Sequence, residues 1–333
     1  MHLMKNSCFY GLIIFLTTSS LIANPGSRIW NEFQQIQKQR QSFKNYSFLK
    51  QESQQRSNLF LDKAPKSSFW NLDLSELQNI QKEQPEFLLI DLKDYQQTEF
   101  QLLLIKQVIY SEDAKVITSD DPNKGEVLNQ GIHYRGIIKA YPGSIVALSI
   151  FGDQIMAVLS TPDKGNIVFG KMNAESLHAE QDLPHVLYYE NDLPVNSGFQ
   201  CGTSDVYPTD IEAVSLVAPD TIFSNHCKTI KVFLECDYRL YTDRNSQKNQ
   251  VTTYISGLFN VVKTLYYNEF VNIEISEIMV WTTQDPFLHT DLQSIIFNYT
   301  NYRKNNFNGN LAQLVTTYPP QQQGGIALSL IHI

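Results

Sequence analysis

The chain has 333 residues, of which 42% are hydrophobic, and its formal net charge is −8. This length and composition allow at least one sizeable hydrophobic core. The acidic balance argues against a nucleic-acid partner, because phosphate binding requires a cationic surface.

The first residues predict export. Lys5 supplies a positive charge, residues 8–16 form a short apolar run, and small residues precede a cleavage site after about Ala23. A transmembrane helix needs ~20 apolar residues, so a signal peptide over residues 1–23 is favoured over the alternative, a short membrane anchor. No later segment is long enough to span a bilayer. We therefore expect a secreted, extracellular protein without a stable membrane span.

Residues 24–60 are polar and rich in Gln, with Lys and Arg interleaved. This composition predicts a polar helix or a partly disordered pro-region and not a binding patch.

Residues 61–222 predict a β-rich domain. Its clearest part is an antiparallel meander in which apolar runs alternate with Pro-Gly and Gly-Asp turns; its predicted strands cover 133–141, 145–151, 154–159 and 165–169. The earlier apolar runs 87–91 and 100–105 indicate strands or short helices against a sheet. His133 and His185 are isolated in the sequence, and we expect them to be ordinary hydrogen-bonded histidines without a catalytic role.

Three cysteines remain after removal of the signal peptide: Cys201, Cys227 and Cys236. In an oxidising compartment an odd number leaves one thiol free, bonded to another chain, or waiting for a partner. The strand predicted between Cys227 and Cys236 would hold them ~30 Å apart, far beyond the ~7 Å limit for a disulfide. Cys236 is expected to be buried, and Cys227 is a disulfide candidate whose partner is missing. A free thiol at Cys201 could act as a removable metal ligand.

Beyond about residue 223 the pattern alternates between strands and helices. Strands are predicted over 228–237, 271–281 and 311–316, and a further strand from Gly324. The apolar phase of the second strand shifts near Ser276, which indicates a bulge or burial on both faces. A helix with the apolar face Ile255, Leu258, Phe259, Val262, Leu265 and Tyr266 is expected to begin at a cap formed by Asn245 and Ser246. A capping box from Thr290 to Gln293 predicts another helix. Solvated or sheet-edge positions are expected for Glu274, Glu277 and Asp285.

Several of these segments resemble the reprolysin/ADAM-type zinc metalloproteases of the metzincin class. In the β-rich domain the resemblance is carried by His133-Tyr-Arg-Gly136, by Pro142-Gly-Ser144 and by Cys201-Gly202-Thr203. In the following part it is carried by the segment 254–262, by Glu277-Ile-Met-Val-Trp281 and by Asp285-Pro-Phe287.

The resemblance implies an α+β protein with a β-rich pro-domain followed by a metzincin-like α/β catalytic domain over residues 223–333. It implies zinc as the cofactor and a protein or peptide as the substrate. Cys201 would be a cysteine switch, the inhibitory zinc ligand of a zymogen. Gly325, Ile326 and Ala327 would form the substrate rim through main-chain groups.

Two departures from the family pattern shape the functional expectation. None of the seven histidines lies in His-Glu-x-x-His, the motif that supplies two zinc ligands and the general base. We therefore expect a zymogen fragment that ends before the zinc-binding helix, has no catalytic residue, and is inactive as written; residues 328–333 also depart from the family. The segment between Gly202 and Lys228 has no pair of basic residues for a proprotein convertase. The alternative is a secreted, non-catalytic binding, adhesion or inhibitory module.

Overall fold

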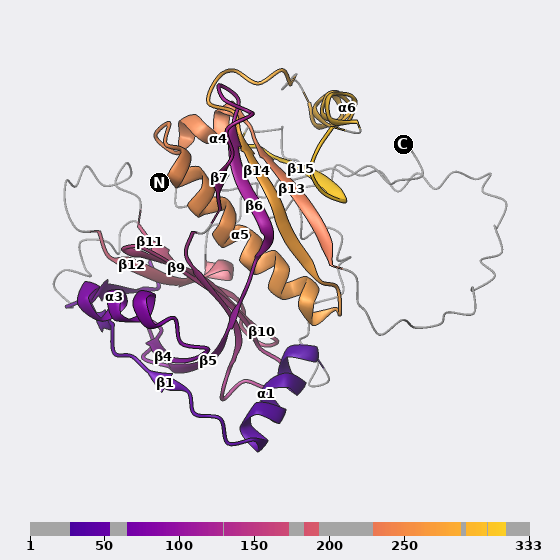
Figure 1. Ribbon diagram of the computed structural model, residues 1–333. Helices are drawn as coiled ribbons and strands as arrows, with labels where there is room; N and C mark the ends of the chain where they lie inside the picture. Colours follow the sequence, from indigo (N-terminus) through magenta and orange to yellow (C-terminus); the bar gives the residue numbers. More distant parts are fainter. Residues whose placement is uncertain are drawn as a thin grey trace, which may run out of the picture.

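The computed structural model describes residues 27–53, 65–128, 130–172, 183–192, 229–287, 291–304 and 306–317 (Figure 1). We call the described residues from 27 to 192 the N-terminal unit and those from 229 to 317 the C-terminal unit. Strands of the N-terminal unit occur in both sheets of the molecule, whereas the long helix α5 (Lys248–Asn268) of the C-terminal unit lies between the two sheets.

The larger sheet has ten strands and is built by the N-terminal unit alone. In spatial order the strands are β1 (Lys44–Asn45), β4 (Phe87–Lys93), β5 (Glu99–Gln107), β8 (Ile132–Ile138), β9 (Ile145–Phe151), β10 (Gln154–Thr161), β11 (Gly165–Lys171), β12 (His185–Tyr189), β3 (Ser67–Leu72) and β2 (Leu49–Gln51). Only the β1–β4 pair is parallel. The predicted antiparallel meander is thus present in the structure.

Two helices of the N-terminal unit pack on this sheet. Helix α3 (Leu74–Glu83) buries Leu77 and Ile80 in the core that the curled sheet encloses, and Asp73 caps it by accepting from Glu76 N. Helix α1 (Arg28–Lys38) buries Ile29 and Phe33 in a separate cluster with residues of β5, β8 and β9. Of the two alternatives predicted for the Gln-rich stretch, a polar helix or a partly disordered region, the structure shows a helix over its first part. A short 3₁₀ turn (Glu190–Asp192) ends the unit.

The smaller sheet combines strands of both units. Its order is β15 (Leu311–Val315), β13 (Ile230–Cys236), β14 (Ile273–Val280), β6 (Tyr110–Thr118) and β7 (Glu126–Val127). All pairs are parallel except β6–β7. The pairing of β13 with β14 shifts between Ile275 and Glu277, so Ser276 forms the bulge that its sequence phase predicted. Cys236 is fully buried in the core of this sheet, as expected.

Two helix starts differ from the sequence-based expectation. The stretch after Asp237 forms helix α4 (Tyr238–Asp243), and Asn245 and Ser246 follow it with positive φ angles of 56° and 53°. A helix cap needs an extended backbone, so the N-cap of α5 is instead Gln247, which makes no side-chain cap hydrogen bond. Helix α6 (Leu292–Arg303) is capped by Asp291, which accepts from Ser294 N, one residue after the start of the predicted capping box.

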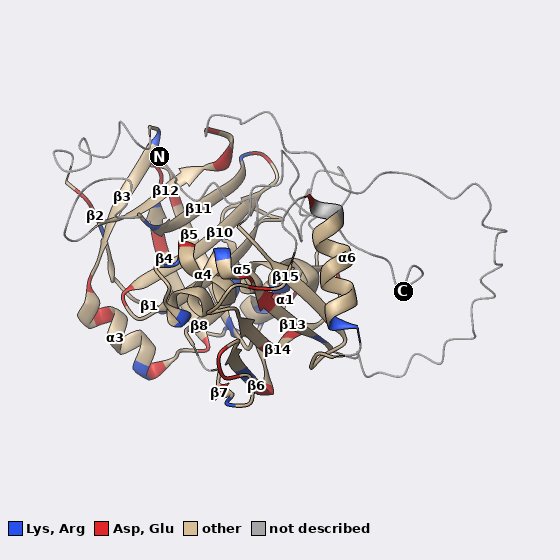
Figure 2. Cartoon of the chain, turned by 90° about the horizontal axis from the view of Figure 1, so that it is seen from above, with Lys and Arg blue, Asp and Glu red and all other residues tan. Residues whose placement is uncertain are grey.

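The α+β class expected from the sequence is confirmed. Figure 2 shows acidic and basic residues interspersed over the outer elements, whereas α5 is almost entirely uncharged, with Lys248 and Lys263 as its charged residues. Among the helices of the described residues, no helix is both long and apolar enough to cross a membrane.

Candidate functional site

Helix α5 is buried on two opposite faces. One face places Ile255, Phe259 and Val262 in the core of the five-stranded sheet, as the sequence predicted. The other face meets β8, β9 and β10 of the N-terminal unit and carries a polar residue at every fourth position. Residues four apart share one face of a helix. We call this row the polar stripe; its members are Thr252, Ser256, Asn260, Thr264 and Asn268, each at most 8% exposed.

The centre of the polar stripe binds the backbone of the ten-stranded sheet. Asn260 Nδ2 donates to the carbonyl oxygens of Tyr134 on β8, at 3.2 Å, and of Leu148 on β9, at 3.1 Å. Gln107, at the end of β5, donates from Nε2 to Asn260 Oδ1 at 2.6 Å and to Thr264 Oγ1 at 2.9 Å. These bonds offset the cost of burying the amides, and they fix the helix at one position along the sheet.

The helix also approaches this sheet closely at Gly257. A Cβ atom at that position would lie 2.8 Å from Sδ of Met156 on β10. The lack of a side chain therefore lets α5 lie against β10, and it brings the polar stripe within hydrogen-bonding distance of the sheet.

The N-terminal end of the polar stripe meets a cluster built around Tyr110. The Tyr110 hydroxyl makes hydrogen bonds with Ser256 Oγ at 2.7 Å and with the carbonyl oxygen of Gln130 at 2.9 Å. Thr252 donates to Gln130 Oε1 at 2.8 Å. Burial raises the pKa of Tyr110 to about 12, so the hydroxyl stays protonated and available as a donor at neutral pH.

His133 lies behind this cluster. Its ring nitrogens are within hydrogen-bonding distance of Ser149 Oγ and of the Gln130 carbonyl, and its ring packs edge-on against Tyr110. Burial lowers the pKa of His133 to about 4, so its ring is neutral. His185 is also buried; its Nε2 accepts from Ile155 N, and burial lowers its pKa to about 4. Both are hydrogen-bonded core histidines, as predicted.

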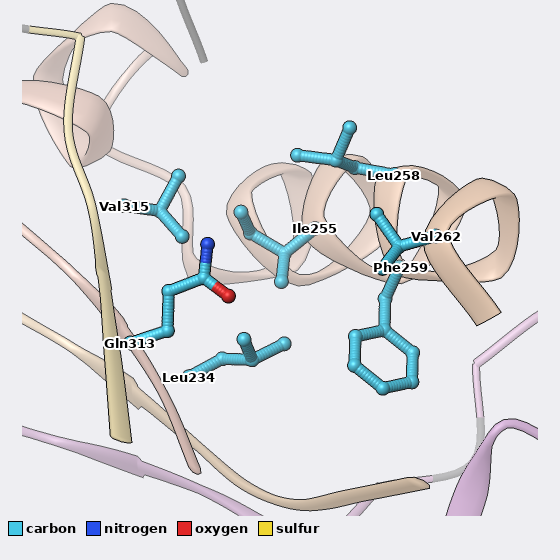
Figure 3. A pocket seen from close by; sticks show the side chains of 7 residues that line it. All are labelled: Leu234, Ile255, Leu258, Phe259, Val262, Gln313 and Val315. Atoms are coloured by element: carbon cyan, nitrogen blue, oxygen red, sulfur yellow. The ribbon is translucent and has the colours of Figure 1, made fainter. Parts of the chain in front are cut away.

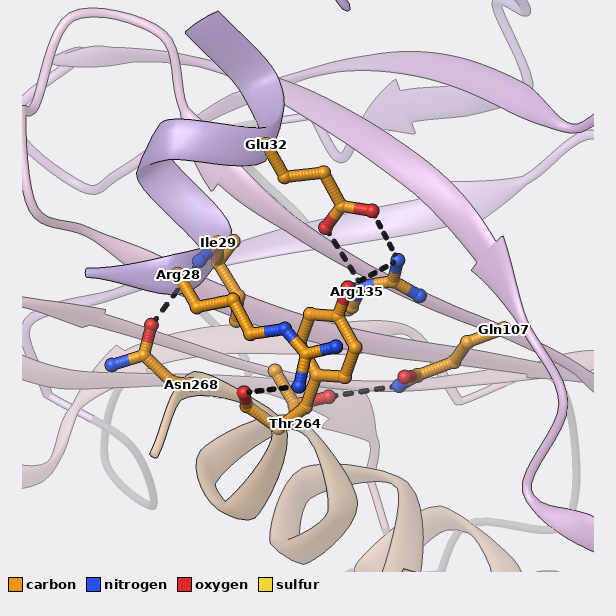
Figure 4. A network of polar contacts seen from close by, with 8 residues as sticks. Arg28, Ile29, Glu32, Gln107, Arg135, Thr264 and Asn268 are labelled. Atoms are coloured by element: carbon orange, nitrogen blue, oxygen red, sulfur yellow. Dashed lines mark hydrogen bonds and ion pairs between the residues drawn. The ribbon is translucent and has the colours of Figure 1, made fainter. Parts of the chain in front are cut away.

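The C-terminal end of α5 is held by cationic side chains (Figure 4). The guanidinium of Arg28 lies 3.7 Å from the Tyr267 ring centre, and that of Arg135 lies 4.2 Å from it. Arg28 also donates to the Tyr267 carbonyl at 3.4 Å, and Ile29 N donates to Asn268 Oδ1 at 3.4 Å. Positive charge is favourable at a helix C-terminus and over an aromatic face.

Glu32 of α1 completes this group by binding Arg135 through both carboxylate oxygens, at 2.6 and 3.2 Å. We call Arg28, Ile29, Glu32 and Arg135 the clamp. Arg28, the first residue of α1, belongs to the Gln-rich stretch and contacts α5. This stretch therefore takes part in an interface within the chain, whereas its composition predicted no binding patch.

The pairing of β14 with β6 forms the second part of the contact between the units. Strand β6 pairs with β14 in parallel, so a strand of the N-terminal unit extends the sheet that β13, β14 and β15 form. Ion pairs join the units here: Lys115 with Glu277 at 3.4 Å, Lys231 with Asp113 at 3.1 Å, and Lys248 with Glu126 at 2.6 Å.

The carboxylates singled out in the sequence have structural partners. Solvated or sheet-edge positions were expected, but Glu277 and Asp285 are both buried, and Glu277 lies on β14, which has a neighbouring strand on each side. Glu277 faces Lys115, whereas Asp285 accepts from the backbone nitrogens of Tyr238 and Phe287 at 3.1 Å each. Glu274 is half-buried and lies 3.8 Å from Lys263. The described residues contain no group of three or more His, Cys, Asp or Glu side chains that could hold a metal ion.

An ion pair between a fully buried carboxylate and a partly buried guanidinium attaches α6 to the five-stranded sheet. Glu235 on β13 accepts from Arg303 Nε at 2.6 Å and from Arg303 Nη2 at 2.7 Å. Trp281 Nε1 donates to the same carboxylate at 2.6 Å. The carboxylate is thus held by three donors, which indicates a structural role.

A small apolar hollow lies between α5 and the strands β13 and β15 (Figure 3). Its lining is apolar apart from one amide, Gln313; the other residues are Leu234, Ile255, Leu258, Phe259, Val262 and Val315. Without a titratable side chain, this hollow supplies no acid, base or nucleophile.

The site residues predicted from the family resemblance fall outside the described residues. These are Cys201, Cys227 and the rim residues Gly325, Ile326 and Ala327. Their roles therefore remain predictions. Conversely, sequence reasoning did not identify the polar stripe, although a signal was present: small polar residues recur at strict four-residue spacing in a helix with almost no charge.

Two comparisons bear on this arrangement. The model of the Reprolysin (M12B) family zinc metalloproteases matches residues 228–330. The chain is also similar to the rat (Rattus norvegicus) disintegrin and metalloproteinase domain-containing protein 1, with 23% identity over 229 residues. That alignment covers 66% of this chain and 28% of the relative, so the chain spans little more than a quarter of it. The resemblance seen in the sequence is thereby confirmed: residues 228–330 match the reprolysin family model, and the chain is similar to a protein of the ADAM type.

Proposed function

We propose that this chain is part of the precursor of a secreted zinc metalloendopeptidase, in which the N-terminal unit is the pro-domain of the C-terminal unit. The observation that carries the proposal is the pairing of β6 with β14. Because β6 precedes Cys201 in the chain, a segment from the predicted pro-domain extends the sheet of the residues that match the reprolysin family. A close cover of this kind is suited to keeping a protease latent.

The residues at hand do not fit a catalytic zinc ion. A catalytic site needs three protein ligands and an open position, and the sequence has no His-Glu-x-x-His to supply them. We therefore assign the zinc-binding helix to residues that follow this sequence in the complete precursor. In this proposal Cys201 supplies one thiolate, which would occupy the open coordination position of the zinc ion in the zymogen. The main-chain groups of Gly325, Ile326 and Ala327 would form the rim that binds a peptide substrate.

The experiment compares two proteins, the 333-residue chain and the product of its complete reading frame. Zinc content and peptide hydrolysis are measured with and without a chelator, before and after a cut between residues 193 and 228. We expect zinc and chelator-sensitive hydrolysis only in the complete product, with hydrolysis increasing after the cut. Chelator-sensitive hydrolysis by the 333-residue chain would contradict the assignment of the zinc ligands. A complete product without zinc or activity would contradict the proposed protease.

A further inference from the structure

The sequence contains two Asn-x-Ser/Thr motifs, the acceptor pattern for N-linked oligosaccharides: Asn45-Tyr-Ser47 and Asn298-Tyr-Thr300. For such a motif to be used, the asparagine amide and the hydroxyl two residues later must be accessible and able to approach each other. The product also has to leave room for a bulky, hydrated group. The fold meets these conditions at one motif and not at the other.

The first motif lies between the two ends of the ten-stranded sheet. Strand β1 is at one end of the strand order and β2 is at the other, and only residues 46–48 separate them in the chain. We call residues 44–51 the seam segment. Its inner side is fixed, because Tyr46 and Phe48 are buried in the core that the curled sheet encloses. The Tyr46 hydroxyl and Lys44 Nζ both bind the carboxylate of Glu83, at the end of α3.

Both reactive groups of this motif face outward. From Asn45 to Phe48 the side chains are in turn exposed, buried, exposed and buried, which is the alternation of an extended chain. Asn45 and Ser47 therefore share the outer side of the seam segment. The Asn45 amide donates to Asp91 Oδ2 at 3.4 Å, a long bond between two exposed side chains. An oligosaccharide on Asn45 Nδ2 would thus extend into solvent and displace no buried group.

The second motif lies within α6. Residues two apart project about 200° from each other around a helix, so Asn298 and Thr300 face different sides of α6. Both side chains are half-buried, and Asn298 Nδ2 donates to the carbonyl oxygen of Ser294 at 2.7 Å, one turn earlier. The helix therefore keeps the amide and the hydroxyl of this motif apart.

We propose that Asn45 carries an N-linked oligosaccharide and that Asn298 does not. The modification rests on the export that is part of the proposed function. Its donor is an oligosaccharide linked to a lipid diphosphate. Asn45 Nδ2 bonds to the anomeric carbon of the donor sugar, the bond from that carbon to the diphosphate oxygen breaks, the lipid diphosphate leaves, and Nδ2 gives up one proton. The second hydrogen on Nδ2 stays and can still donate to Asp91.

The modification would also mark one face of the N-terminal unit as free. Figures 1 and 2 both show β1 and α3 on the opposite side of the molecule from β13 and β15. An oligosaccharide on the seam segment therefore does not obstruct the C-terminal unit. It keeps other protein surfaces away from β1 and the end of α3, so any further part of the complete precursor must pack elsewhere.

The test expresses the full 333-residue chain in eukaryotic cells in two versions. One keeps residues 1–23, and the other has an established signal peptide in their place. An amidase that removes N-linked oligosaccharides converts the acceptor asparagine to aspartate, so peptide mass spectrometry identifies the modified residue. We expect a loss of one oligosaccharide from the chain, and conversion at Asn45 alone.

The two versions separate this proposal from the proposed function. An unmodified Asn45 in the version with the established signal peptide would overturn the proposal and leave the protease assignment untouched. Conversion at Asn298 would overturn the assignment of the second motif. If only the version with residues 1–23 stays in the cytosol, export is contradicted, and with it the modification of the natural chain.

Substitutions establish that the motif itself is used. Asn45→Gln removes the acceptor and Ser47→Ala removes the hydroxyl, so each should abolish the mass loss on amidase treatment. Both positions are exposed, so both variants should fold. Asn79→Gln, at an exposed position of α3 outside either motif, is the matched control and should keep the full mass loss. An unchanged mass loss in Ser47→Ala would contradict the use of this motif.

Discussion

Gln107 Nε2 lies 2.6 Å from Asn260 Oδ1, although the two residues are 153 positions apart in the sequence. This bond joins the end of β5 in the N-terminal unit to the middle of α5 in the C-terminal unit. Both side chains are buried, so the bond is shielded from water and its loss leaves polar atoms without a replacement partner. The two units are therefore coupled at the centre of their interface by a specific polar contact.

Replacement of Asn260 by Leu should lower the free energy of unfolding by about 3 kcal/mol, because two carbonyl oxygens and Gln107 lose a buried partner. The double variant Gln107→Leu with Asn260→Leu should lose less free energy of unfolding than the two single variants together. The difference, the coupling energy, should be about 1 kcal/mol. Urea denaturation measures both quantities. Asn249→Leu, at an exposed position of α5, is the control and should change stability by no more than about 0.5 kcal/mol. Strict additivity of the Gln107 and Asn260 changes would contradict the coupling.

The stability of the protein should fall as the pH drops from 6.5 to 4. His133 and His185 have folded-state pKa values of about 4, below the ordinary value of 6.5, because burial disfavours the charged ring. Between these pH values the unfolded chain binds more protons than the folded one, so acid favours unfolding. Each histidine should account for about 3 kcal/mol over this window. Denaturation of His185→Gln at several pH values should show a shallower slope than the parent; an identical slope would contradict its assigned pKa.

The buried pair of Glu235 and Arg303 should respond asymmetrically to substitution. Arg303→Met leaves the Glu235 carboxylate buried without its cation and should cost about 3–5 kcal/mol. Changing both residues, as Glu235→Leu with Arg303→Met, should restore most of that loss. Lys171→Met removes an exposed ion pair with Asp153 and should cost no more than about 1 kcal/mol. Thermal unfolding of the three proteins tests this order; a larger loss in the double variant than in Arg303→Met would contradict it.

The proposed cysteine switch can be tested at Cys201 in the complete precursor. Serine is a much poorer zinc ligand than thiolate, so Cys201→Ser should weaken latency, with peptide hydrolysis detectable before any cut. Equal latency of the two precursors would mean that the N-terminal unit inhibits by cover alone. Cys236→Ser is no suitable control because that side chain is fully buried; Ser53→Ala, in the N-terminal unit, is exposed and should leave latency unchanged.

The sequence predicted those elements whose side-chain period is clear. The meander around β8 to β11 and the bulge at Ser276 follow from alternation and its interruption, which are local signals. The N-caps Gln247 and Asp291 were missed, since several polar residues in a row can each act as a cap and the backbone decides among them.

The interface between the units could not be predicted in the same way. The strands predicted from the sequence do not include β6, and only tertiary packing pairs it with β14. The polar stripe was visible as a pattern, but its meaning depends on a second sheet lying over α5. Nothing in a single helix specifies whether a row of Thr, Ser and Asn faces water or the carbonyl oxygens of a sheet.

The central claim, that this chain is part of a zinc metalloendopeptidase precursor, is tested most directly by reading its transcript beyond the codon for Ile333. The account predicts that the reading frame continues and encodes His-Glu-x-x-His, which would supply the zinc ligands and general base that the present sequence lacks. A transcript in which the frame stops without that motif would contradict the claim and favour the alternative, a non-catalytic binding module.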